Sequence, residues 1–350
     1  MTGAAPELVE VRAFEYAGIE PTELAVGHDS LVKSLGYECY RALYASGLAR
    51  RMEGVSLSKL KEVSAYPELM EAVVEAMARG GYVRLAGGRV SRFLDLTPPP
   101  ETVPWVDRIM RSLRSAFEAL PDLLISGAQP RLDRETRRLA TLAMYDNPVA
   151  RFQSALALLG MGMTDAQLIR RWADVGLIPA TVLLPWSGIG MVAVDALRLI
   201  GAKIVAGVPP GDLRAARLVV STLKAPETGR LRLVESDLES FGQKVRSSPG
   251  LVEGQADAAV LIDAVQWAGA GFEALLKSLD GVLAEEAPLF LLQALREGDS
   301  QVIGIPYALL GGSLPPTRGE LEYALKLSGY RSRELIKGRG VVLLRASRRE

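Results

Sequence analysis

The sequence is short of the residues that bind metals and form disulfides. It contains one cysteine, Cys39, and one histidine, His28, in 350 residues. A single cysteine excludes a disulfide framework, and without a cluster of Cys and His a metal centre is not expected. No apolar run is long enough to span a bilayer, and the N-terminus lacks the basic and then apolar pattern of a signal peptide. We therefore expect a cytoplasmic protein without a metal.

The sequence also lacks an excess of charge of either sign. Lys and Arg together number 41, as do Asp and Glu, so the composition gives no argument for a nucleic-acid or membrane partner. Asparagine occurs once, at Asn147, and arginine outnumbers lysine. Few thermolabile residues fit a thermophilic source, although a GC-rich genome produces the same arginine bias. With 49% hydrophobic residues, a chain of this length suits two globular domains.

The N-terminal part is predicted to contain three helices and a hairpin. Residues 1–30 show no clear period and are predicted to be a strand plus an ordered arm. Apolar residues at near-helical spacing then predict a helix over 31–48. A second helix is predicted from Ser56, with Ser58 and Glu62 in its cap region, and a third over Glu68–Arg79. Residues 82–91 carry a Gly-Gly pair at their centre, which predicts a β-hairpin.

Three helices followed by such a hairpin resemble a winged helix-turn-helix domain. In that resemblance Glu68–Arg79 is the recognition helix, but it carries three acidic residues before its first basic one, Arg79. A helix that enters a phosphate-lined groove should be basic. We therefore expect a protein–protein or dimerisation module, with a DNA-binding regulator as the less favoured alternative.

A stiff linker at Thr97–Pro100 leads to a helical connector. Apolar patterns predict four helices in it, over residues 103–120, 134–145, 149–159 and 168–175. Near the second of these helices lies a basic cluster, which is either a solvated helix face or a contact for an anion or acidic partner. The cluster consists of Arg131, Arg134, Arg137 and Arg138.

From Thr181 onward, apolar runs alternate with helical segments. This alternation predicts a doubly wound parallel sheet with right-handed crossovers, whose ligands bind at the carboxyl ends of the strands. The predicted strands are 182–184, 203–208, 231–234, 258–262, 288–292 and 340–344, and the predicted helices are 191–200, 212–223, 272–283 and 318–328. Residues 334–336 and 341–344 are expected to form a closing antiparallel hairpin.

Two glycines one residue apart, Gly188 and Gly190, follow the first of these strands. A strand, a tight glycine turn and a helix begin a nucleotide-binding sheet, because glycine allows close backbone approach to a ligand. The turn differs from the usual pattern, since Trp186 stands where a third glycine is expected and no carboxylate ends the second strand at Pro209. Asp212 is a substitute for that carboxylate or the cap of the next helix.

In order and spacing these segments resemble class I S-adenosylmethionine-dependent methyltransferases, of the kind that joins a winged-helix domain to a Rossmann-like domain and includes small-molecule O-methyltransferases. The resemblance rests on Val182–Gly190, Ala206–Val208, Leu233–Leu238, Asp257–Asp263 and Ser328–Tyr330. It implies a seven-strand α/β methyltransferase domain over 181–350, an N-terminal arm and winged-helix dimerisation domain over 1–96, and a connector over 97–180. It further implies S-adenosylmethionine as cofactor, a small-molecule substrate and a homodimer formed through the N-terminal domain.

The resemblance also assigns the cofactor-binding positions. They are Pro185, Trp186, Ser187, Gly188, Gly190, Val208, Pro209, Asp237, Leu238 and Asp263. In the family Asp237 would contact adenine. The family's catalytic histidine corresponds to Gln266, which cannot take up a proton at neutral pH and would only orient a substrate. Asp263 or Asp237 remains a candidate base, and methyl transfer also proceeds by orientation alone when the acceptor is already nucleophilic.

Three functions stay open from the sequence. The first is an active methyltransferase with an altered cofactor pocket, and the second is a fold relative that has lost the cofactor and serves as a dimeric scaffold. The third is an enzyme that uses the pocket for another ligand or reaction. A substrate is expected to be bounded by residues 145–163 and by the glycine- and proline-rich segment 306–316, which is a lid or an ordered turn.

Overall fold

The computed structural model describes residues 6–94, 97–99, 102–164, 180–223, 229–297, 299–338 and 340–348. The chain divides into two compact units. One, the sheet unit, comprises residues 1–20, 144–295 and 316–350, and the other, the helical unit, comprises 21–143 and 296–315. The boundaries expected at residues 96 and 180 do not coincide with this division, because residues 1–20 join the sheet and most of the connector joins the helical unit.

The sheet unit is built on a seven-stranded sheet with the order β5-β4-β3-β6-β7-β9-β8. The first five of these strands in that order are parallel, and β9 pairs antiparallel with both β7 and β8. This confirms the predicted doubly wound sheet and its closing hairpin. The strands are β3 (Thr181–Leu184), β4 (Lys203–Val208), β5 (Leu231–Glu235), β6 (Ala258–Ile262), β7 (Leu289–Ala294), β8 (Arg331–Gly338) and β9 (Val341–Ser347).

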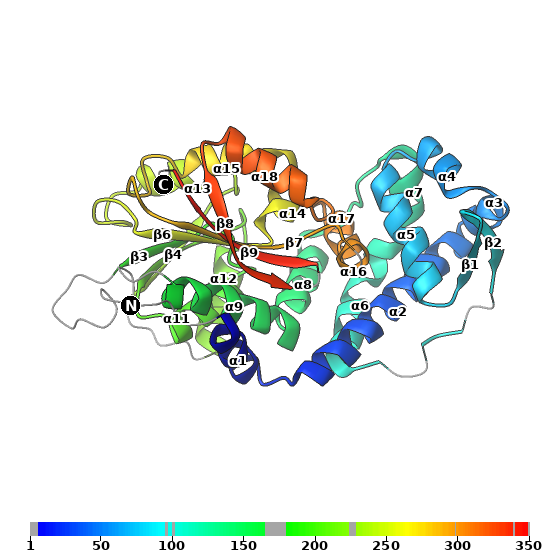
Figure 1. The fold of residues 1–350 in the computed structure, drawn as a ribbon, viewed down its shortest axis with the longest axis horizontal. Helices are drawn as coiled ribbons and strands as arrows, with labels where there is room; N and C mark the ends of the chain where they lie inside the picture. Colours follow the sequence, from blue (N-terminus) through cyan, green and yellow to red (C-terminus); the bar gives the residue numbers. More distant parts are fainter. Residues whose placement is uncertain are drawn as a thin grey trace. The chain divides into compact units, whose positions relative to one another are not determined.

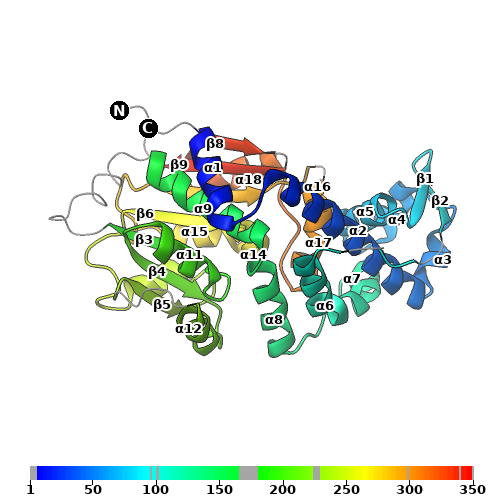
Figure 2. The same cartoon turned by 90° about the horizontal axis from the view of Figure 1, so that it is seen from below.

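Helices cover both faces of this sheet (Figures 1 and 2). Apolar side chains that alternate along the strands form the core beneath each layer; Leu183, Leu261 and Leu291, for example, face the same cluster. That cluster is closed by α13 (Phe241–Arg246), α15 (Phe272–Ser278) and α18 (Arg318–Leu327). The opposite layer contains α1 (Pro6–Ala17), α9 (Pro148–Thr164), α11 (Met191–Leu199) and α12 (Leu213–Thr222). The short α14 (Ala264–Ala268) follows β6.

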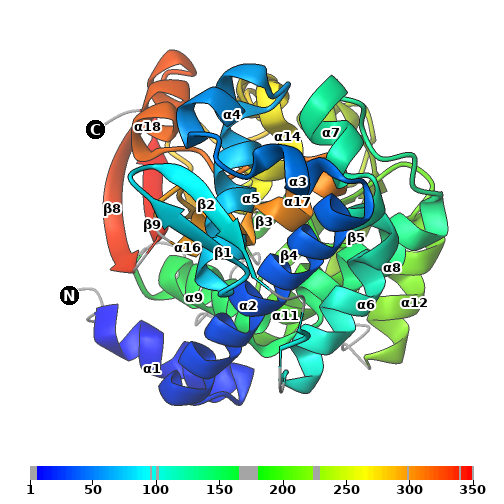
Figure 3. The ribbon, with the colours of Figure 1, turned by 90° about the vertical axis from the view of Figure 1, so that its right-hand side faces the viewer.

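The helical unit is organised around the long helix α2, which packs against α5 and α6 (Figure 3). Its closest approach is at Gly36, where an added Cβ would lie 2.3 Å from the carbonyl oxygen of Ala76. The predicted hairpin is present, turned by two glycines with positive φ, Gly87 and Gly88. The elements are α2 (Pro21–Ala45), α3 (Leu48–Met52), α4 (Leu57–Val63), α5 (Pro67–Arg79), β1 (Val83–Ala86), β2 (Arg89–Phe93), α6 (Pro104–Glu118), α7 (Leu120–Ser126), α8 (Arg134–Tyr145), α16 (Asp299–Ile303) and α17 (Ile305–Leu309).

One sequence-based expectation, that for residues 1–30, is wrong. Residues 1–30 hold α1 and the start of α2 instead of a strand and an arm. Leu8 and Val11 are exposed on α1 although the helix packs on α9, which blurs the apolar period. The segment 306–316, expected to be a lid or an ordered turn, begins within α17 and folds back so that Gly304 approaches Pro315. The helix predicted over 168–175 lies outside the described residues, and no helix in the described part is long and apolar enough to cross a membrane.

A buried carboxylate, Asp195 of α11, links three helices of the sheet unit. It is 3% exposed and accepts a hydrogen bond of 2.7 Å from the hydroxyl of Tyr16 in α1. Burial raises the pKa of Asp195 from 3.8 to about 6, although Tyr16, Arg151 and Arg198 favour the charged form. Burial is the main cause that raises the pKa of the Tyr16 hydroxyl, and the Asp195 carboxylate raises it further. The protonated form of Asp195 is therefore the one that folding favours.

We predict that Asp195→Asn stabilises the protein at neutral but not at acidic pH. Because the pKa of Asp195 is about 6 in the folded protein and 3.8 in the unfolded chain, the protonated carboxyl contributes to the free energy of unfolding. This contribution is fully present below pH 3.8 and is lost as the pH rises through about 6. The amide keeps the hydrogen bond from Tyr16 and has no charge to desolvate. Urea unfolding should show a gain of ~1–3 kcal/mol at pH 8 that vanishes near pH 4. A gain independent of pH would contradict this explanation.

Candidate ligand site at the turn between β3 and α11

The turn that joins β3 to α11 has a backbone that few sequences adopt. Gly188, Ile189 and Gly190 have φ values of 54°, 56° and 94°, three left-handed residues in succession. Glycine adopts this region freely, whereas the β-branched Ile189 does so at a cost of about 1–2 kcal/mol. The helix α11 begins at the next residue, Met191. The two glycines identified in the sequence therefore form the tight turn expected of them.

Neighbouring groups hold this turn closely against β4. A Cβ atom on Gly207 would lie 2.1 Å from the carbonyl oxygen of Pro185, so only glycine fits there. The Ser187 hydroxyl donates to the Gly207 carbonyl at 2.6 Å and accepts from the Gly190 N–H at 3.2 Å. Ser187 is fully buried. Although predicted to contact a cofactor, its side chain instead joins the turn to β4.

Trp186 belongs to an aromatic cluster with the buried Tyr145 and the half-buried Trp267. The two indole rings stack with centroids 4.8 Å apart and an angle of 27° between their planes. Both indole N–H groups donate to the Tyr145 hydroxyl, each at 2.8 Å. Trp186 is 8% exposed and Tyr145 is 5% exposed. The indole that the sequence places at the glycine loop is therefore held by protein partners.

Within this cluster the Tyr145 ring lies directly on the bare backbone of Gly188. A Cβ atom added at Gly188 would be 2.7 Å from Cγ of the tyrosine ring. The residues from Pro185 to Gly190 are all buried. Trp267 was missed from the sequence, and Tyr145 was identified only as the first residue of the segment 145–163 expected to bound a substrate, because only the fold brings both rings to the turn.

At the ends of β4 and β5 the site is more open and carries carboxylates. Val208 is buried, and Pro209 offers no side-chain acceptor. In the sheet, however, Val208 pairs with Glu235, whose carboxylate accepts a hydrogen bond from the Gly211 N–H. Glu235 therefore supplies, from the neighbouring strand, the acidic side chain that the end of β4 lacks. It was missed because strand register is not visible in the sequence.

The remaining predicted positions on this side differ in exposure. Asp237 is exposed in the turn after β5 and Leu238 is half-buried against the core. Asp212 lies at the N-cap position of α12 and is buried, but its side chain makes no capping hydrogen bond to that helix. Glu235 is thus the last residue of β5 and Asp237 follows it, while Val208 is buried and Leu238 packs against the core.

The predicted catalytic candidates lie in a buried polar network at the ends of β6 and β7. Gln266 is fully buried; its amide N–H₂ is 3.4 Å from Asp263 Oδ1, and its oxygen accepts from the amide of Gln293. Asp263 Oδ1 also accepts from the Ala294 N–H at 3.3 Å. Gln266 and Asp263 are therefore brought together, but as mutual partners that join two strand ends. Gln293 was missed from the sequence.

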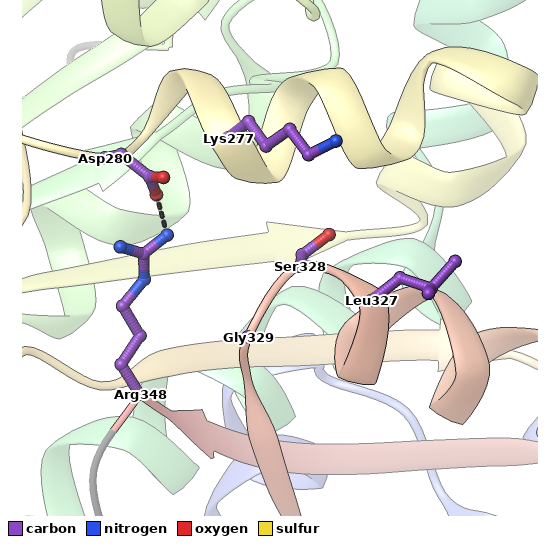
Figure 4. A pocket seen from close by; sticks show the side chains of 6 residues that line it. All are labelled: Lys277, Asp280, Leu327, Ser328, Gly329 and Arg348. Carbon is purple, nitrogen blue, oxygen red and sulfur yellow. Dashed lines mark hydrogen bonds and ion pairs between the residues drawn. The ribbon is translucent and has the colours of Figure 1, made fainter.

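A separate hollow of about 330 Å³ lies at the other end of the strands (Figure 4). Lys277, Asp280 and Arg348 line it, and Arg348 is paired with Asp280. Arg348 follows β9, whose Ala346 pairs with Leu289 at the start of β7, so the hollow is at the amino end of the parallel strands. Ligands of open α/β sheets bind at the carboxyl ends. We therefore place the candidate site at the turn and not at this hollow.

Sequence comparison finds no relative: no family model matches the chain, and no curated protein matches it. Solved structures do match. The carbon-methyltransferase domain of the citrinin polyketide synthase has a TM-score of 0.62 at 13% identity and covers 100% of both chains. The CurJ carbon methyltransferase has a TM-score of 0.60 at 12% identity and covers 98% of both.

A third similar structure is an O-methyltransferase family 2 protein from Planctomyces limnophilus, determined in complex with apigenin. Its TM-score is 0.51 at 12% identity, with 99% of this chain and 100% of that chain covered. At such identities the similarity shows the fold alone. The fold is that of class I methyltransferases of the O-methyltransferase type, as the sequence resemblance predicted.

That fold implies S-adenosylmethionine, and the two ends of the site fit it differently. The adenosine end fits, since the half-buried Glu235 and the exposed Asp237 offer acceptors at the end of β5. At the methionine end, the bare backbone of Gly188 is in contact with Tyr145. This end accepts a ligand only if that ring moves.

We predict that the contact between Tyr145 and Gly188 is measurable as a coupling energy. Gly188→Ala should cost about 1 kcal/mol for the left-handed backbone and a further 1–3 kcal/mol for overlap with the ring. In a Tyr145→Ala background the second part should disappear. Denaturant unfolding of the single and double variants gives the coupling directly.

Gly190→Ala is the matched control for this cycle. Gly190 is also left-handed, but its Cβ would meet Ala216 and not Tyr145. Its cost should be the same with and without Tyr145. An equal cost of Gly188→Ala in both backgrounds would show that the ring does not rest on the turn.

Proposed function

We propose that this protein is an S-adenosylmethionine-dependent methyltransferase that acts on a small molecule. The observation that carries the proposal is the turn at Gly188–Gly190, left-handed throughout and placed at the carboxyl end of β3. In a sheet with this strand order, that position is where the two halves of the sheet diverge and ligands bind. The methyltransferase fold of the solved structures supports the same assignment.

The residues at the strand ends suit the parts of such a cofactor. We propose that Glu235 accepts hydrogen bonds from the ribose hydroxyls and Asp237 from the adenine amine, with Val208 and Leu238 against the adenine ring. Gly188 and Gly190 would present bare backbone to the methionine part. When bound, the cofactor supplies an electrophilic methyl group on a sulfonium.

No proton acceptor is proposed in the place of the family's histidine. Gln266 cannot take up a proton, and its amide is already bonded to Asp263 and Gln293. Asp263 holds the ends of β6 and β7 together through the Ala294 N–H. We propose that these residues maintain the shape of the site, and that the protein acts on an acceptor that is nucleophilic without deprotonation, through orientation.

We predict that the wild-type protein binds S-adenosylmethionine and S-adenosylhomocysteine in a calorimetric titration. Glu235→Gln and Asp237→Asn should each weaken binding about tenfold, because each removes a charged acceptor. Glu253→Gln is the matched control, since Glu253 pairs with Lys203 at the opposite end of the strands. Absence of binding up to millimolar concentration in the wild type would contradict the proposal.

We further propose that the protein is a cytoplasmic homodimer formed through its helical unit. In this unit the end of α4 adjoins α7, where the Ala65 N–H donates to the Leu124 carbonyl at 2.9 Å. Apolar Val63 and Ile125, on either side of this contact, are 64% and 56% exposed. Exposed apolar residues on adjoining elements are typical of an association surface.

Sedimentation velocity at micromolar concentration should therefore show a dimer. A Val63→Glu, Ile125→Glu double variant should shift it to the monomer, because two charges would be buried in the interface. Leu139→Glu, an exposed leucine of α8 in the same unit, should leave the dimer intact. A wild-type monomer would refute the homodimer.

A further inference from the structure

We infer that Tyr145 is a gate over the methionine end of the site, while the adenosine end stays open. This inference rests on the proposed function and concerns how the same site is filled. In the closed state the protein binds the adenosine part alone. It binds the complete cofactor only when the tyrosine ring has left Gly188.

The closed position of the ring is specified by three separate contacts. Its face rests on Gly188, and its hydroxyl accepts hydrogen bonds from the indoles of Trp186 and Trp267. The stacking of those two indoles fixes the direction of both donors. The ring is therefore held in place by donors built for it, and does not merely fill a gap.

The adenosine end has none of these contacts. Glu235 is half-buried and Asp237 is exposed, and the partner of the Glu235 carboxylate is the backbone of Gly211. The carboxylates of Glu235 and Asp237 thus lie at the end of β5, whereas Trp186 and Trp267 of the aromatic cluster follow β3 and β6. A ligand that lacks the methionine part has no reason to displace Tyr145.

Tyr145 is also placed where the chain can move it. It is the last residue of α8, and Asn147 caps α9 by accepting from the Ala150 N–H at 3.0 Å. The Asn147 amide donates to the Met144 carbonyl at 2.7 Å. Tyr145 therefore lies at the junction between α8 and α9.

The opening of the gate breaks the hydrogen bonds that the Tyr145 hydroxyl accepts from the two indoles. A ligand that binds the closed and open states equally well does not shift the equilibrium between them. For a ligand that binds only the open state, the apparent dissociation constant is the intrinsic one divided by the fraction of protein that is open. The gate therefore makes a specific prediction: Tyr145 lowers the affinity for S-adenosylmethionine and leaves that for adenosine unchanged.

The experiment is a calorimetric titration of the full chain with S-adenosylmethionine and, separately, adenosine. Tyr145→Ala removes the ring and should bind S-adenosylmethionine at least ~10-fold more tightly than the wild type. Tyr145→Phe keeps the ring but not the acceptor for the two indoles. Its affinity for S-adenosylmethionine should lie between those of the wild type and Tyr145→Ala. Adenosine affinity should stay within ~2-fold in all three proteins. Tyr323→Ala, which removes an exposed tyrosine of α18, should behave as the wild type.

The possible outcomes separate the gate from the proposed function. Equal affinity of wild type and both Tyr145 variants for S-adenosylmethionine overturns the gate and leaves the methyltransferase assignment standing. Adenosine binding without S-adenosylmethionine binding in Tyr145→Ala overturns it too, since something else then closes the methionine end. If no protein binds either ligand, the proposed function fails and the gate fails with it.

Because Tyr145→Ala leaves a cavity, the wild-type protein provides a second measurement. Trp186 and Trp267 lose their shared acceptor when the gate opens, so their fluorescence should change on addition of S-adenosylmethionine. Adenosine should leave the emission unchanged. An identical change with both ligands would contradict a gate that responds to the methionine part.

Discussion

The sheet unit depends on one backbone constraint, the close approach of the β3–α11 turn to β4. Pro185 and Gly207 meet where even a methyl group would overlap, and three left-handed residues then redirect the chain into α11. The Ser187 hydroxyl fixes both sides of this approach. Since the turn is buried, its position determines which side chains can contact Gly188.

The same constraint creates a competition for one surface. A glycine without a side chain offers a flat contact to any group that approaches it, whether a ligand or a residue of the protein. Here Tyr145 occupies that contact, and its hydroxyl accepts hydrogen bonds from the buried indole of Trp186 and the half-buried indole of Trp267. The site thus has one end closed by Tyr145 and another end that presents carboxylates. At the closed end, a ligand must displace the tyrosine ring from Gly188.

Much of this fold could be predicted from the sequence because its strands are buried on both faces. Continuous apolar runs gave β4 and β6 with their observed bounds, and the spacing of Gly188 and Gly190 identified the turn. The aromatic cover could not be predicted, since Tyr145 lies 41 residues from Trp186 and 122 from Trp267 in the chain. Glu235 was missed for a related reason: its position beside Val208 is a property of register. Gln266 was identified, but its burial against Gln293 follows only from the pairing of β6 and β7.

The central claim is that a ligand for this turn must displace Tyr145. The most direct measurement is a crystal structure of the protein with S-adenosylhomocysteine, which carries the amino-acid part of the cofactor. We expect the amino-acid part to lie on Gly188 and the Tyr145 hydroxyl no longer to accept hydrogen bonds from Trp186 and Trp267. A bound ligand with the tyrosine still on Gly188, or a ligand bound away from the turn, would contradict it.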